Sequence, residues 1–288
     1  YIGYTATPFA NVFIDPTVAD DLYPRDFIYP MPRPEGYFGP EMIFGRDVLD
    51  GDGDSNFDGY DLVRIIPEED EFLYRPLNKE ETDSFVPVIT EDLRNALCWF
   101  LLATAARWHR EGPVDSSMLI HTSFNTVVHH AYKAPLQKEL NAIREAVKAG
   151  ETATIKALKD LWNSENERLD MPRERPVEAF DEILEYLPAV IEDCRVIIDN
   201  SRSDDRLSYE EETQNTIIAV GGNTLSRGIT LEGLVCSFFI RPSNTYDTLL
   251  QMGRWFGFRP GYEDLPRIWM TDTLRRNFRH LALVEYEM

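Results

Sequence analysis

Two arginines near the end of the sequence have neighbours and spacing that suit phosphate chemistry. Arg254 and Arg259 lie in the run QMGRWFGFR, which starts at Gln251 and places Gly253 directly before the first arginine. A planar guanidinium can donate paired hydrogen bonds to a phosphate and stabilise the charge that develops during phosphoryl transfer. The alternative is that both arginines form structural salt bridges, because ion-pair networks also collect arginine.

A pair of glycines marks a second place where a ligand can approach the backbone. Gly221 and Gly222 directly follow the apolar run 216–220, which is predicted to be a buried strand. Open α/β sheets bind ligands beyond the carboxyl ends of their strands, and glycine permits close approach of the backbone to a ligand. Gly222 is therefore a candidate ligand contact.

Taken in order, three short stretches resemble motifs III, V and VI of superfamily-two helicases. They are TATP at residues 5–8, GGNTLSRGI at 221–229 and the run that starts at Gln251. In those helicases two RecA-like α/β lobes clamp ATP between them and act on nucleic acid. The resemblance implies that Thr5 and Thr7 couple the nucleotide state to nucleic-acid binding. Without it, two threonines at the end of a strand are expected to cap a turn.

The second stretch departs from the helicase pattern at one position. Ser226, Arg227 and Gly228 match motif V, and the resemblance implies that they lie at the nucleotide. Thr230 stands where helicases often carry an aspartate that contacts the ribose. A hydroxyl can still donate one hydrogen bond, so ribose recognition at this position stays open.

The third stretch departs in its spacing. A common helicase form is Gln-x-x-Gly-Arg-x-x-Arg, whereas here Gln251 lies two residues before Gly253, and Arg259 lies five residues after Arg254. The resemblance implies that Gln251 lies near the nucleotide and that an arginine contacts the γ-phosphate. Arg254 follows the glycine as in the motif, and which arginine acts as the finger stays open.

A narrower resemblance extends over more of the sequence. Residues 1–15, 22–29, 36–39 and 251–262 are similar to the Z1 (Z-one) domain family. That resemblance implies a bacterial protein with a superfamily-two ATPase core, of a kind commonly named an endonuclease and associated with restriction-like or phage-defence systems. It therefore implies DNA as a partner, possible defence-system subunits among the partners, and ATP with Mg²⁺ as cofactors.

The sequence lacks the loop that normally holds ATP. No Gly-x-x-x-x-Gly-Lys-Ser/Thr pattern occurs, so no cradle of backbone amides and lysine is predicted for the β- and γ-phosphates. If the helicase resemblance holds, ATP and Mg²⁺ are bound mainly by a first lobe upstream. The 288 residues alone are then expected to be inactive as an ATPase.

Composition limits the partners and the compartment. A formal net charge of -21 argues against a surface that attracts nucleic acid generally, so any DNA contact is expected to be local. The three cysteines, Cys98, Cys194 and Cys236, show no paired spacing, which is typical of a reduced cytoplasm and of buried core thiols. No apolar run is long enough to predict a membrane span.

The pattern of apolar residues predicts the elements that position these groups. Continuous apolar runs near 118–121, 216–220 and 234–240 are typical of buried parallel strands, and 267–270 is a plausible further strand. A long apolar helix is predicted from Glu91, with Thr90 as its N-cap. Together these elements predict an α/β fold, a three-layer RecA-like parallel sheet of the P-loop NTPase type with a helical insertion.

The predicted organisation divides the chain into three parts. Residues 1–15 are assigned to the end of a first RecA-like lobe, 16–112 to a family-specific segment, and 113–288 to the second lobe, with a helical insertion at about 130–212. Two other functions stay open: an endonuclease domain acting on DNA, and a non-catalytic assembly module with a degenerate motor fold. No metal-ligand spacing is found; His129 and His130, for example, lack a partner at such spacing.

Overall fold

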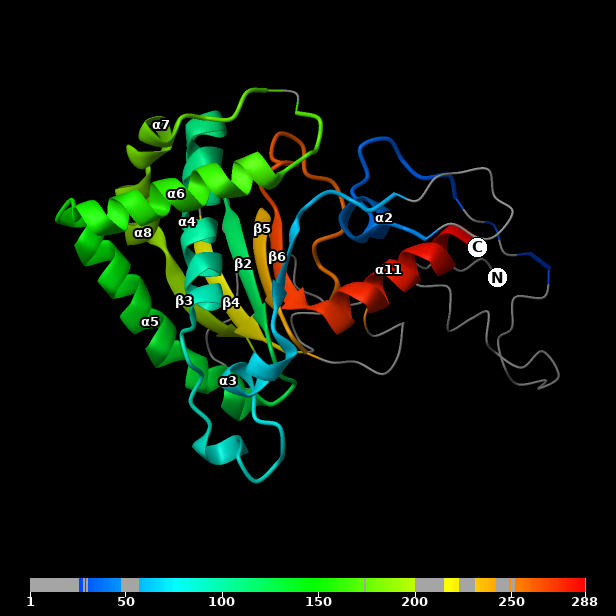
Figure 1. Cartoon of the computed structure of the whole chain (residues 1–288), viewed down its shortest axis with the longest axis horizontal. Coiled ribbons are helices and arrows are strands. Elements are labelled where there is room, and N and C mark those ends of the chain that lie inside the picture. The colour runs from blue at the N-terminus through cyan, green and yellow to red at the C-terminus, as the bar shows by residue number, and fades with distance from the viewer. Residues whose placement is uncertain are drawn as a thin grey trace.

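The computed structural model, shown in Figure 1, describes residues 26–27, 29, 31–47, 57–173, 175–199, 215–222, 231–241, 249 and 252–287. Its strands are β1 (Val63–Ile66), β2 (Ser116–His121), β3 (Arg195–Asp199), β4 (Thr216–Gly221), β5 (Leu234–Phe239) and β6 (Arg267–Thr271). Its helices are α2 (Pro40–Phe44), η1 (Glu68–Asp70), α3 (Glu71–Tyr74), η2 (Thr82–Ser84), α4 (Glu91–Glu111), α5 (Thr126–Lys148), α6 (Thr152–Arg168), α7 (Phe180–Leu184), α8 (Leu187–Asp193) and α11 (Asp272–Glu287).

The strands form one six-stranded sheet in the order β1-β6-β5-β2-β4-β3, and every pair is parallel. All residues of β2, β4 and β5 are buried, which is typical of the central strands of a parallel sheet. The three strands that the apolar runs predicted are confirmed, as is β6. The α/β class with a parallel sheet is therefore confirmed.

Two strands were not predicted from the sequence. β3 lies within the stretch interpreted as a helical insertion, and β1 lies in the segment assigned to residues 16–112. Each forms an edge of the sheet, since β3 pairs only with β4 and β1 pairs only with β6 among the described strands. The sheet thus draws its strands from both sides of the predicted boundary at 112/113.

One face of the sheet carries most of the helices, as Figure 1 shows for α4, α5, α6 and α8. α4 runs across this face, and its N-cap is the predicted one, because Thr90 Oγ1 accepts a hydrogen bond from Leu93 N at 3.3 Å. α5 buries Leu136, Leu140, Ile143 and Val147, which are spaced to lie on one face of a helix. Pro188 lies in the first turn of α8, where proline is tolerated.

The other face is covered beside β5 and β6 by α2 and α11 (Figure 1). Alternate residues of a strand point to opposite faces, so Trp269 packs with the α4 side whereas Ile268 and Met270 pack with the α11 side. Stacked aromatic rings of Phe44 and Phe278, 4.9 Å apart, join α2 to α11. Helices on both faces make this a three-layer α/β domain.

The burial of the cysteines and the character of the helices bear on two expectations from composition: buried core thiols, and no apolar run long enough to span a membrane. Cys194 and Cys236 are buried, and the half-buried Cys98 packs against the main core, all as free thiols. Among the described helices, none combines the length and the apolar character needed to cross a membrane.

Candidate functional site

The order of the strands singles out the carboxyl end of β2. The chain leaves β2 for β3, which lies on the β4 side, whereas it leaves the neighbouring β5 for β6, on the opposite side. The direction of the connections therefore reverses between β2 and β5. Open α/β sheets bind ligands in the crevice at such a switch point.

A histidine and an arginine meet at this point. His121 is the last residue of β2 and is buried, and Arg241 lies two residues beyond the end of β5. Arg241 Nη1 donates to His121 Nε2 at 3.0 Å, so Nε2 carries no proton of its own. Burial, followed by the charge of Arg241, lowers the pKa of His121 well below its usual value. The imidazole is therefore neutral, and the positive charge of the pair belongs to Arg241.

An exposed aromatic ring lies beside this pair. Phe124 is 69% exposed, and the guanidinium carbon of Arg241 lies 5.8 Å from its ring centroid. Asn125 follows as the N-cap of α5 and accepts a hydrogen bond from Val127 N at 2.9 Å. The mouth of the switch point thus offers an aromatic face next to a guanidinium, a combination that suits a nucleobase and its phosphate.

Gly222 lies where the sequence predicted, directly after β4 at the same edge. A β-carbon added there would lie 2.9 Å from Cε1 of His129 and 3.6 Å from Cα of Phe124. The His129 ring is buried and is held by a 2.8 Å hydrogen bond from Nε2 to the carbonyl oxygen of Ser123. Gly222 is therefore needed because only a residue without a side chain fits between the strand end and α5.

The predicted phosphate-binding run is described from Met252 onward. Gly253 is covered by the ring of Phe256, since an added β-carbon would lie 2.6 Å from Cε2 of that ring. Trp255 is buried, and its ring lies 5.2 Å from Phe239 at the carboxyl end of β5. Arg254 is half-buried beside it, and burial lowers the pKa of Arg254.

Arg259 lies elsewhere. Its guanidinium carbon is 5.9 Å from the ring of Tyr262, and the guanidinium carbon of Arg107 is 4.2 Å from the same ring. Arg107 Nη1 donates to Ser116 Oγ at 2.8 Å, at the first residue of β2. Arg107 thus lies at the amino end of the sheet, opposite the end where Gly222 lies, and Arg259 extends toward it. The structure does not bring Arg259 and Gly222 together.

Several candidate residues lie outside the described part of the chain. They are Thr5, Thr7, Ser226, Arg227, Gly228, Thr230 and Gln251. The candidate site consequently rests on Gly222 and on groups that the sequence did not single out for a ligand. His121, Phe124 and Arg241 carry no sequence motif, and only their positions after two predicted buried strands could have pointed to them.

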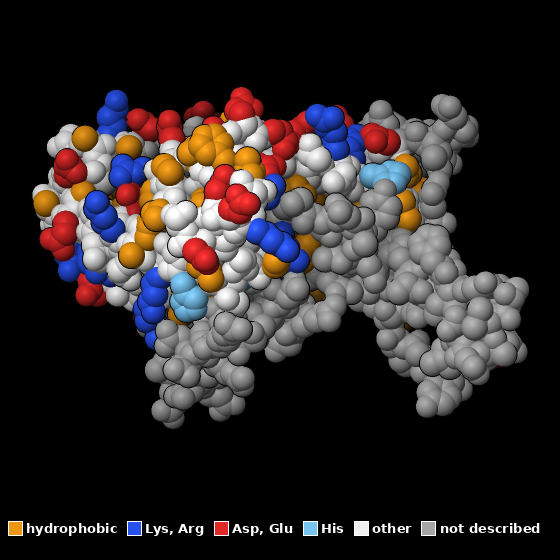
Figure 2. Space-filling view, turned by 90° about the horizontal axis from the view of Figure 1, so that it is seen from below, with side chains coloured by type: hydrophobic (Ala, Val, Ile, Leu, Met, Phe, Trp, Pro, Cys, Tyr) orange, Lys and Arg blue, Asp and Glu red, His pale blue; other side chains and the backbone are white. Residues whose placement is uncertain are grey.

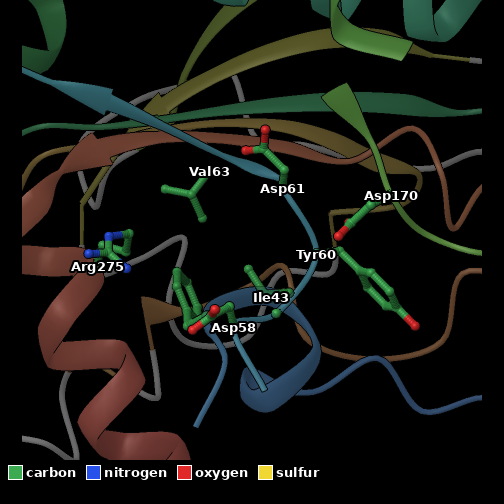
Figure 3. Close-up of a pocket in the computed structure, with 9 residues that line it drawn as sticks. Ile43, Asp58, Tyr60, Asp61, Val63, Asp170 and Arg275 are labelled. Carbon is green, nitrogen blue, oxygen red and sulfur yellow. The ribbon is translucent and has the colours of Figure 1, made fainter. Parts of the chain in front are cut away.

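A cavity of about 290 Å³ lies on the other side of the molecule, between β1, α2 and α11 (Figure 3). Asp58, Asp61 and Asp170 line it together with Arg275. Two of these carboxylates are already paired, because Asp58 lies 3.1 Å from Arg279 Nη2, and Asp61 contacts both Arg64 and Arg168. Within the described ranges, no group of three histidine, cysteine or acidic residues can hold a metal ion. This cavity is therefore the weaker candidate.

Comparison with known proteins adds a family. No curated protein and no solved structure matches the chain. A family model does match, the Z1 domain, over residues 92–288. This span runs from the first turn of α4 to the end of the sequence and includes five of the six described strands. The chain therefore belongs to the Z1 domain family.

Proposed function

We propose that this chain supplies the second RecA-like lobe of an ATP-dependent DNA helicase or translocase in a restriction- or phage-defence-like system. The observation that carries the proposal is the switch point of an all-parallel sheet, where Gly222, Phe124 and Arg241 lie close together. The order of the three helicase-like stretches supports it independently.

The proposed nucleotide site is shared between two lobes. The sequence contains no phosphate loop, so the loop and the Mg²⁺ ligands are assigned to a first lobe outside these 288 residues. Bound ATP supplies the phosphoryl group whose transfer to water drives the motor. The residues of this chain contribute positive charge at Arg254, with Ser226, Arg227 and Gly228 expected alongside, and Gly222 lets the end of β4 pack closely against α5 next to the site.

The placement of the two arginines favours one of them as the finger. Arg254 adjoins Trp255 at the carboxyl end of β5, whereas Arg259 is buried against Tyr262 toward the amino edge. Arg259 Nη2 also donates to the carbonyl oxygen of Arg254 at 3.3 Å, so it can hold the backbone that carries the finger. We assign Arg254 to the γ-phosphate and Arg259 to the scaffold.

Substitution of each arginine in the full-length protein tests this assignment. Arg254→Ala should lower nucleic-acid-stimulated ATP turnover by about 10³-fold with little change in nucleotide affinity, because a finger acts mainly in the transition state. Arg259→Ala should instead lower the midpoint of thermal unfolding. Phosphate release, nucleotide titration and calorimetry measure the three quantities. Parental turnover in both variants would remove the motor assignment.

The exposed ring of Phe124 provides a second test, in which binding is measured without turnover. Phe124→Ala should weaken single-stranded DNA or nucleotide binding by about 1–3 kcal/mol, because stacking on one base contributes that much. Folding should be unaffected, since the ring is exposed. Separate titrations with oligodeoxynucleotide and with ATP show which base occupies the ring. Unchanged affinity for both would exclude Phe124 from the site.

Experiments on residues 1–288 and on the full-length protein also distinguish the two other functions, an endonuclease domain and a non-catalytic assembly module. Metal-dependent DNA cleavage by residues 1–288 alone would favour an endonuclease domain. A full-length protein without a phosphate-loop lysine and without acidic Mg²⁺ ligands would favour a non-catalytic assembly module.

A further inference from the structure

The segment between β1 and α4 exposes four large apolar side chains. Phe72 is 55% exposed, Leu77 60%, Val86 67% and Val88 46%. Hydrophobic side chains lie among acidic ones on the described part of the underside in Figure 2. We call residues 67–92, with these four side chains, the acid-rimmed surface.

The acid-rimmed surface is fixed in place. Val88 N donates to the carbonyl oxygen of Leu73 at 2.9 Å, which joins the extended stretch before α4 to α3, next to Phe72. The side chains of this extended stretch point in two directions. Phe85 and Ile89 pack against the main core, whereas Val86 and Val88 are exposed. Val86 and Val88, and Phe72 beside them, are therefore exposed on an anchored part of the fold.

Charge limits what can cover this surface. Residues 67–92 contain nine acidic and two basic side chains, a net charge of -7. The acidic residues are Glu68, Glu69, Asp70, Glu71, Glu80, Glu81, Asp83, Glu91 and Asp92, and the basic ones are Arg75 and Lys79. DNA would be repelled, and a second copy that used the same face would place -7 against -7. Val86 and Val88 extend from one stretch, and Val88 is bonded to Leu73, the neighbour of Phe72, so these three side chains are grouped. Grouped exposed apolar side chains with a polar rim mark sites of protein association.

We propose that the acid-rimmed surface docks a protein partner whose contact segment carries apolar side chains flanked by lysine or arginine. The apolar side chains would cover Phe72, Val86 and Val88, and the basic ones would meet the acidic rim and direct the orientation of docking. The surface is joined to α5, whose N-cap lies at the candidate site, since Tyr132 of α5 donates from its hydroxyl to the carbonyl oxygen of Tyr74 at 2.6 Å. The proposal does not depend on the motor assignment.

Three synthetic peptides of about twenty residues serve as probes. All three follow the same helical pattern, so that residues of one type lie along one face of the helix. The first carries leucine on one face and lysine on the other, the second replaces lysine with glutamate, and the third replaces leucine with serine. Fluorescence anisotropy with the whole chain should give affinity for the first peptide only, since the second lacks the basic charge and the third lacks the apolar face.

A matched pair of triple variants locates the binding. Phe72→Ser/Val86→Ser/Val88→Ser should weaken binding of the leucine–lysine peptide by at least about tenfold, the expected loss when apolar contacts of about 1.4 kcal/mol or more are removed. Phe27→Ser/Tyr29→Ser/Met31→Ser removes three apolar side chains that are on average more exposed from a part of the chain that lacks the acidic rim, and it should bind as the parent does.

A charge variant tests the rim by itself. Glu80→Lys/Asp83→Lys changes the segment charge from -7 to -3 and should weaken binding of the leucine–lysine peptide, because less negative charge attracts its lysines. Equal losses in both triple variants would overturn the proposal, as would binding of the serine–lysine peptide at parental affinity. A parental dimer that the first triple variant dissociates, measured by sedimentation, would show that a second copy is the occupant and would also overturn it.

Discussion

The arginines at the amino ends of the strands and those at the carboxyl ends are held in different ways. These two ends of the sheet are called the amino edge and the carboxyl edge. At the amino edge, Arg267 starts β6 and lies 2.9 Å from Glu165, which also binds Arg64. Arg110 contacts Glu178 and Asp264 at 2.6 and 2.7 Å. Burial by itself would raise the pKa of Glu165, but the hydrogen bonds and charges of its two arginines hold it below the usual value.

At the carboxyl edge, the described contacts of Arg241 are of another kind. They are a neutral imidazole, that of His121, and the face of the exposed Phe124 ring. A buried carboxylate fixes an arginine in a structural role. The described contacts therefore assign a structural role to the arginines of the amino edge, whereas the carboxyl edge is where the proposed nucleotide site lies.

Removal of the central carboxylate at the amino edge should have the largest effect. Glu165→Ala leaves Arg64 and Arg267 buried without their shared partner, and we expect a loss of about 3–5 kcal/mol in the free energy of unfolding. Denaturant titration measures it. As a control, Asp181→Ala breaks an exposed pair with Lys159 and should cost at most about 1 kcal/mol. Similar costs for the two variants would end the distinction between structural and surface pairs.

A substitution at the carboxyl edge should have an intermediate effect. Gly222→Ala forces a β-carbon against the held ring of His129, and overpacking of this kind costs about 1–3 kcal/mol. The double variant Gly222→Ala/His129→Ala removes the obstacle and should be less destabilised than the sum of the single variants. Simple additivity of the two costs, measured by thermal unfolding, would show that the close approach has no energetic consequence.

The pH dependence of stability should show the smallest effect. Because the pKa of His121 is lowered in the folded state, the unfolded chain takes up a proton first as the pH falls below about 6.5. The stabilisation is complete above that pH and is lost below it. His121→Gln keeps an oxygen that can accept from Arg241 and should reduce the slope of unfolding free energy between pH 7 and 5. An unchanged slope would mean that His121 titrates normally.

The central part of the fold was predictable because its strands are uniformly apolar. β2, β4 and β5 read as buried parallel strands without reference to any neighbour. β3 was not predicted because the apolar residues of α7 and α8 continue at helical spacing to Cys194, the residue directly before the strand. The start of the strand could therefore not be distinguished from the helical pattern. β1 was hidden because an edge strand of four residues, with Ile65 exposed, lacks a continuous apolar run.

The candidate site was predictable only in part. Gly222 was identified because glycine after a strand is a local signal. The pairing of His121 with Arg241 spans 120 positions and leaves no local trace. Arg254 and Arg259 are five positions apart, yet one adjoins the carboxyl end of β5 and the other faces Tyr262 toward the amino edge.

The sequence by itself determined the class of the fold, the overall acidity and the position of Gly222, because apolar continuity, charge and glycine act locally. The tertiary structure decided which strands are neighbours, and hence where the switch point lies. It also decided which arginines are buried with carboxylates. The physical reason is that parallel pairing and ion pairing join residues far apart in the chain, so their partners are set only when the sheet assembles.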